Sequence, residues 1–179
     1  MPYGAAEGSA MPKRPAVEPT LTAILRRQLD CSLQMLAKAI ELCPDDAWAD
    51  EAAHAPVWEQ IYHALFWFHA WLRDWSKPIE YPEFHIKEAL DIKRRAGSSI
   101  DRRQMAGYLA KVRADYEVFM AGVTDEGLLA SEKAFGRAWT MADRILGQVR
   151  HIQHHVGYLN AILSTTRGIR VRWIGYGER

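Results

Sequence analysis

The sequence has little cysteine, almost no excess of charge and no long apolar run. Its 179 residues include only Cys31 and Cys43, and neither has a ligand-type neighbour at metal-binding spacing, so we interpret both as reduced thiols. The formal net charge of +1 gives no electrostatic reason to expect a nucleic-acid partner. No segment provides about 18 uninterrupted apolar residues, which excludes a membrane-spanning helix. The first residues also lack the apolar run of a signal peptide, so we expect a cytoplasmic protein.

Apolar and aromatic residues are plentiful instead. Nearly half of the residues are apolar (49%), and there are seven tryptophans and seven tyrosines. This length and composition suit one globular domain with a substantial core, and aromatic rings suit both cores and the walls of pockets.

The hydrophobic pattern predicts four long amphipathic helices and no convincing strand. Residues 1–19 are rich in Pro, Gly and Ala and are expected to form a flexible N-terminal arm. Thr20 can cap the first helix, Thr140 and Asp143 form a capping-box-like pair at the start of the fourth, and the third helix begins at Asp101. The four helices are expected over residues 20–43, from Pro56 to before Pro78, over 101–123 and over 140–166. We therefore predict an all-α four-helix bundle over residues 20–166, followed by a C-terminal tail over 167–179.

The second predicted helix, VWEQIYHALFWFHAWL, leaves almost no polar face. A helix this apolar either occupies the centre of a bundle or is covered by a partner chain. Its aromatic surface is large for three neighbouring helices to cover, and we therefore predict a homodimer.

Histidines mark the fourth predicted helix, in the stretch LGQVRHIQHHVGYLNAIL. His151 and His155 are four residues apart, about 40° apart around a helix axis, and can bind one metal ion. They lie roughly 110° and 70° from the centre of the apolar stripe, whereas His154 lies roughly 170° away and points to solvent. The alternative is that His151 and His155 are partly buried histidines with backbone partners.

A third ligand has to come from another helix, and His63 is the best candidate. A histidine among aromatic residues is also a common core residue, which is the alternative here. Glu59, one turn earlier, either orients a ligand or acts as a base, or is an ordinary solvated glutamate. His69 is rotated roughly 120° from His63 and does not serve the same ion; His54 and His85, in expected loops, are interpreted as surface residues.

Three imidazoles would leave coordination positions open, as catalytic metal sites do. A metal there activates a thiol or a water molecule, with Phe66, Trp67 and Tyr158 as candidate pocket walls. This favours a metal-dependent enzyme of the thiol transferase or hydrolase type. The alternative is a non-catalytic bundle that acts as a sensor or interaction module.

The segments PVWEQIYHALFWFHAWL, RRQMAGYLAKVRADYEVFM and RHIQHHVGYLNAIL resemble the second, third and fourth helices of DinB-like proteins. The resemblance implies a commonly dimeric four-helix bundle that holds a divalent metal, often nickel or zinc, on a histidine triad. Carried over by position, the triad is His63, His151 and His155. The resemblance also implies low-molecular-weight thiols or other small molecules as substrates, but the aromatic second helix and the Arg-rich end depart from the family pattern.

Overall fold

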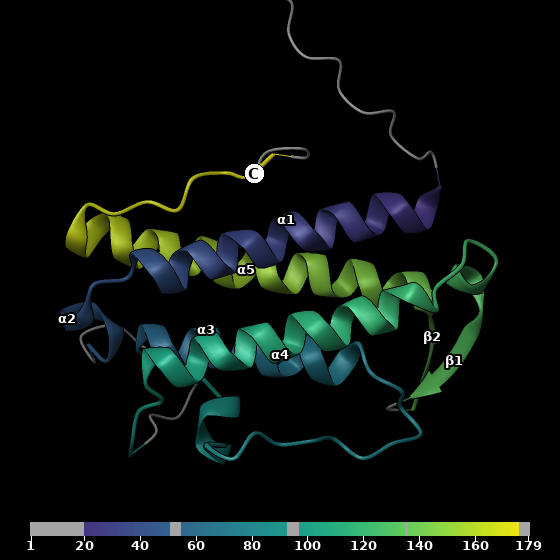
Figure 1. The fold of residues 1–179 in the computed structure, drawn as a ribbon, viewed down its shortest axis with the longest axis horizontal. Helices are drawn as coiled ribbons and strands as arrows, with labels where there is room; N and C mark the ends of the chain where they lie inside the picture. The colour runs from purple at the N-terminus through teal and green to yellow at the C-terminus, as the bar shows by residue number, and fades with distance from the viewer. Residues whose placement is uncertain (1–19, 51–54, 93–96, 135, 176–179) are drawn as a thin grey trace, which may run out of the picture.

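Four long helices form a bundle in the computed structural model, which describes residues 20–50, 55–92, 97–134 and 136–175. They pack alongside one another over most of their length (Figure 1). They are α1 (Leu21–Leu42), α3 (Val57–Trp71), α4 (Arg102–Ala121) and α5 (Met141–Arg167). The predicted all-α bundle is therefore confirmed. The predicted arm, His54 and the last four residues of the predicted tail lie outside the described residues.

The ends of the helices follow local side-chain chemistry. Thr20 accepts a hydrogen bond from the backbone N–H of Ala23 at the start of α1. Asp101 and Thr140 each form a reciprocal capping box at the starts of α4 and α5. Gly168 ends α5 with φ +68°, a left-handed conformation that favours glycine. Side-chain caps of this kind satisfy backbone groups that the helix itself leaves open.

Two short elements between the helices were not expected from the sequence. Strands β1 (Ser131–Ala134) and β2 (Arg137–Thr140) form an antiparallel hairpin, which lies at one end of the bundle (Figure 1). The loop before α3 contains α2 (Asp45–Trp48), whose Trp48 is buried and donates to the carbonyl of Ile100 at 2.8 Å. Single turns of 3₁₀ helix, η1 (Lys87–Leu90) and η2 (Gly127–Leu129), complete the connections.

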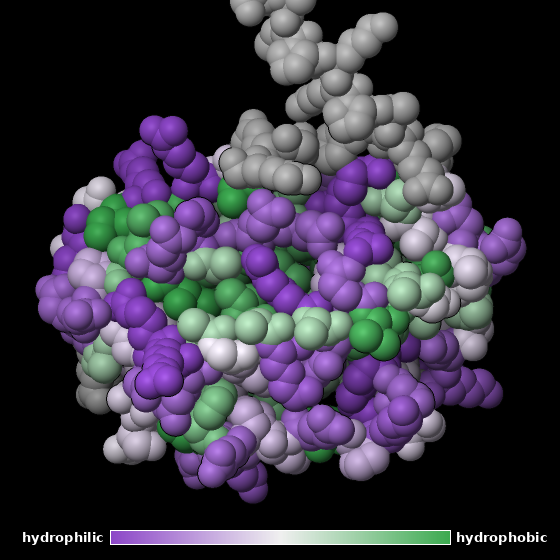
Figure 2. Space-filling view, viewed as in Figure 1, coloured by the Kyte–Doolittle hydropathy of each residue, from purple (hydrophilic) through white to green (hydrophobic). Residues whose placement is uncertain are grey.

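Helix α3 lies at the centre of the core. Tyr62, Phe66 and Phe68 are at most 1% exposed, in a helix that packs against α4, α5 and the connection that contains η1. Much of the aromatic surface of α3 is thus covered within one chain, whereas Trp67 and Trp71 stay partly exposed. The homodimer stays a prediction. On the face shown in Figure 2, hydrophobic residues gather in a strip between α1 and α4, and hydrophilic residues surround it. Among the described residues, none of the helices has both the length and the apolar character needed to cross a membrane.

Arg144, in the first turns of α5, fixes the hairpin to the end of α3. Its side chain is 2% exposed and donates to both carboxylate oxygens of Glu132 in β1, at 2.8 and 2.7 Å. The same guanidinium donates to the carbonyls of Trp71 and Arg73 and lies 3.9 Å from the ring centre of Trp75. A buried cation needs such partners, since desolvation without them is costly. The arrangement brings β2 against α3 and places the ring of Trp139 5.1 Å from that of Trp71.

Candidate metal centre

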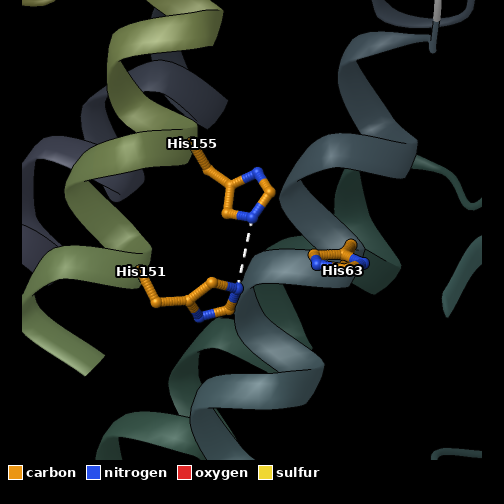
Figure 3. Close-up of side chains that lie close together, drawn as sticks. All are labelled: His63, His151 and His155. Carbon is orange, nitrogen blue, oxygen red and sulfur yellow. Dashed lines mark hydrogen bonds between the residues drawn. The ribbon is translucent and has the colours of Figure 1, made fainter. Parts of the chain in front are cut away.

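Three histidines from two helices converge in the bundle (Figure 3). His63 projects from α3, and His151 and His155 project from adjacent turns of α5. One nitrogen of each ring lies within 4.8 Å of those of the other two, which is close enough to hold a metal ion. His155 is 2% exposed, while His63 and His151 are partly buried. The structure thus brings together the three residues that the sequence analysis selected.

Each of the three imidazoles has a hydrogen-bond acceptor beside its Nδ1 atom. His63 faces the carbonyl of Leu90 at 3.0 Å, His151 faces Oε1 of Gln148 at 3.0 Å, and His155 faces Oε1 of Gln60 at 2.9 Å. Because all three partners are oxygen acceptors, each Nδ1 carries the proton and donates it. The Nε2 lone pairs of the neutral rings therefore remain for another partner, as in metal-binding histidines fixed by an outer hydrogen bond.

The Nε2 atoms of His151 and His155 lie 3.2 Å apart. With the protons on Nδ1, both of these nitrogens are acceptors, and neither can donate to the other. A cation between them would satisfy both lone pairs, and two nitrogens each about 2.0–2.1 Å from a tetrahedral ion are roughly 3.3 Å apart. The spacing and the donor set therefore fit a transition metal for which imidazole is a suitable ligand.

Burial keeps these rings neutral at ordinary pH. Burial, with a smaller contribution from the neighbouring histidines, lowers the pKa of His151 to about 4 and that of His155 to about 3. Burial also lowers the pKa of His63. Desolvation disfavours the charged imidazolium, so the lone pairs of the folded protein are not blocked by protons near pH 7.

The other described histidines lie elsewhere. His154 is exposed on the outer side of α5, and His69 faces Asp115 (Nε2 to Oδ2, 2.8 Å) and Tyr108, as expected for residues outside the triad. His85, interpreted as a surface residue, is partly exposed and also contacts the core. Its Nδ1 lies 2.6 Å from the hydroxyl of Tyr62, and its ring stacks on that of Phe66.

Glu59 also differs from its interpretation as a solvated glutamate, because its side chain is fully buried in α3. Gln60 and Gln148 were missed altogether. Both are buried polar residues on otherwise apolar helix faces, and each stands three residues before a histidine of the triad. For Gln148 this spacing is the signal that could have identified it, because its partner is His151 one turn later. Gln60 pairs with His155 of another helix, so only its place as a polar residue in an apolar helix could have drawn attention to it.

A cavity of about 550 Å³, here called the tryptophan cavity, opens beside the triad. It is lined by His63, Trp67, Trp71, Trp139, Asp143, Arg144, Gly147, Gln148, Arg150, His151 and His154. Of the three predicted wall residues, Trp67 is therefore correctly placed. Phe66 lines a different cavity of about 650 Å³, the second cavity, and Tyr158 is not among the described lining residues of either. Trp71 and Trp139 were missed because the hairpin that brings them together was not foreseen.

A comparison with protein families agrees with this architecture. A family model described as the DinB superfamily matches residues 28–159, which is most of the chain and includes all three histidines. The chain belongs to the DinB superfamily. No curated protein and no solved structure matches it. Membership accounts for the helical bundle and agrees with a histidine cluster that could hold a metal, whereas it assigns no reaction to this DinB-superfamily chain.

Proposed function

We propose that this protein binds a divalent transition metal, nickel or zinc, through His63, His151 and His155, and that it is a metal-dependent enzyme. The observation that carries the proposal is the convergence of one nitrogen from each ring within 4.8 Å, together with an outer hydrogen bond on each Nδ1 that leaves the Nε2 lone pairs for another partner. A core histidine needs only one satisfied nitrogen, and three such rings would not be expected to converge without a shared partner.

The proposed chemistry is transfer to a low-molecular-weight thiol or hydrolysis. A bound ion would supply Lewis acidity, which favours the deprotonated form of a thiol or water molecule beside it. The protein supplies orientation: Gln60, Gln148 and Leu90 hold the three rings. The tryptophan cavity provides room for a small substrate next to His63 and His151.

Glu59 has no assigned role as a base in this proposal. It is buried in α3 and is not among the residues that line the tryptophan cavity, and a general base has to come within hydrogen-bond reach of the proton that it removes. The reacting group is instead expected to lose its proton to solvent or to a second substrate.

Metal analysis with matched variants tests the proposal. Protein purified without chelators or an affinity tag that binds metal is expected to contain or take up close to one equivalent of nickel or zinc. His63→Ala, His151→Ala and His155→Ala should each weaken binding by several orders of magnitude, because no other donor of the described residues joins the group. His154→Ala is the control on the same helix and should bind as the unmodified protein does. Uptake below a tenth of an equivalent, or equal loss with His154→Ala, would refute the metal site.

A non-catalytic sensor or interaction module is the second candidate. It is favoured because two charged side chains that line the cavity are already held by other residues of the protein. Asp143 accepts hydrogen bonds from Thr140, and Arg144 is bound to Glu132. Turnover of a panel of thiols and electrophiles that requires both added metal and His63 would support the enzyme. Metal-dependent stabilisation without any turnover would support the sensor.

A further inference from the structure

We propose that the tryptophan cavity binds a planar aromatic anion, which its three indole rings recognise and Arg150 attracts. The inference rests on the proposed function, since it names the class of substrate that would lie beside the histidine triad. It draws on residues of the cavity wall rather than on the triad itself.

The three indoles form an aromatic wall that is only partly covered by the protein. Trp67 and Trp71 come from successive turns of α3, and Trp139 comes from β2. All three are partly exposed, although the other large aromatic residues of α3 are buried. The rings of Trp71 and Trp139 meet at 72° with centres 5.1 Å apart, so their planes form a corner. A flat ligand in such a corner can lie face-on against one ring and edge-on against the other, the two preferred aromatic geometries.

The opposite wall of the cavity has no side chain at Gly147. This residue lies one turn before His151 in α5, and a Cβ atom added there would meet no atom within 4 Å. Glycine inside a helix is less favourable than alanine by about 1 kcal/mol. Here it leaves open space in a cavity that the three indoles, His63 and His151 also line.

The charges around the cavity select an anion over a cation. Arg144 and Arg150 both line it, against the single carboxylate of Asp143, which is held by Thr140. Arg144 is engaged by Glu132 and by two carbonyls, whereas Arg150 is exposed at the cavity. A quaternary ammonium ion, the usual ligand of an aromatic cage, would meet these guanidinium groups and be repelled. A carboxylate or sulfonate on an aromatic body would gain from Arg150.

Two fluorescent probes with the same aromatic skeleton test the proposal. 8-Anilinonaphthalene-1-sulfonate carries a negative charge, and N-phenyl-1-naphthylamine lacks it. Each is titrated into the full-length protein, both metal-free and zinc-loaded, and affinity is taken from the rise in probe fluorescence. The anionic probe is expected to bind more tightly than the neutral one.

Gly147→Leu should lower the affinity for both probes about tenfold or more, because the new side chain occupies the ring site. Gly157→Leu, at an exposed glycine of the same helix where an added Cβ would also meet nothing, should change neither. Arg150→Gln should lower the affinity for the anionic probe alone, by about two- to fivefold, because an exposed ion pair contributes little binding free energy. Arg103→Gln, at an exposed arginine of α4, is the control and should leave the affinity for both probes unchanged. Trp139→Ala should also lower the affinity for both probes. It provides a second test of the ring site if Gly147→Leu lowers the stability of the protein.

Unchanged binding in folded Gly147→Leu and Trp139→Ala would overturn the proposal, since the probe would then lie elsewhere. Equal affinity for the two probes, or an equal effect of Arg150→Gln on both, would overturn the choice of an anion. Failure of this inference is distinguishable from failure of the proposed function. Probe binding is measured in metal-free protein and does not need the ion, whereas metal uptake is measured without any probe.

Discussion

Replacing Gln60 by leucine isolates the contribution of one outer hydrogen bond to metal binding. Gln60 is 2% exposed and its Oε1 accepts from Nδ1 of His155 at 2.9 Å. Leucine fills a similar volume and provides no acceptor, so the ligand itself is untouched. We expect Gln60→Leu to fold and to bind metal more weakly than the unmodified protein.

Two responses are open to His155 in this variant, and both reduce affinity. If the proton stays on Nδ1, a buried donor loses its acceptor, which costs about 1–3 kcal/mol of folding free energy. Metal affinity falls as well, because the outer hydrogen bond no longer orients the ring or raises its basicity. If the proton moves to Nε2, it can donate to Nε2 of His151, 3.2 Å away, and stability is largely kept. The lone pair that the metal needs is then blocked. Outer-shell changes of this kind typically weaken metal binding about 10–100-fold, or about 1.4–2.7 kcal/mol.

Competition with a chromophoric chelator measures the affinity, and nitrogen chemical shifts of the imidazoles identify which atom carries the proton. Gln28→Leu, at an exposed glutamine of α1, is the control for the change of residue type and should leave affinity unaltered. A folded Gln60→Leu protein whose affinity stays within about twofold of the unmodified value would refute the assignment of the protons to Nδ1, and with it the role given to the outer hydrogen bonds.

Three further predictions concern the scaffold. Arg144→Met should lower the free energy of unfolding by about 2–4 kcal/mol in urea titrations, because Glu132 and the carbonyl of Trp71 lose a buried donor; a loss below 1 kcal/mol would contradict the anchoring role. Thr140→Ala removes the cap of α5 and should cost about 1 kcal/mol, seen as a fall in melting temperature of roughly 2–4 °C. Burial lowers the pKa of His69, although the nearby Asp115 carboxylate acts to raise it. His69 therefore binds a proton near pH 6.5 in the unfolded chain but only at lower pH in the folded chain. The stability of the metal-free protein should therefore decline as pH falls through 6.5, and the decline between pH 7.5 and 5.5 should be smaller in His69→Gln.

The parts of the fold set by neighbouring residues were predictable. Thr20, Asp101 and Thr140 cap helices through contacts within three residues, so the starts of α1, α4 and α5 follow from local sequence. The pairing of His151 with His155 and the outward direction of His154 follow from the helical repeat alone. His63 depends on a tertiary contact; it was the best candidate for a third ligand from the sequence, and the resemblance to DinB-like proteins supported that choice.

Features that depend on distant contacts could not be derived. The hairpin has strands of four residues each, too short for a clear alternation, and its position depends on the ion pair between Glu132 and Arg144. The residues around Glu59 in the sequence do not show how many elements pack around α3, so the burial of the Glu59 side chain was missed. His85 lies in an irregular connection, and only the fold brings it to Tyr62.

Arg144 has one consequence that extends beyond anchoring the hairpin. It lines both the tryptophan cavity and the second cavity, so one guanidinium group is a partition between two compartments. An occupant that shifts this group from one side changes the shape of the wall on the other side, and it also loosens the hold on β1. If an occupant of one cavity displaces this side chain, binding in the two cavities is coupled, and by linkage each occupant then changes the affinity for the other.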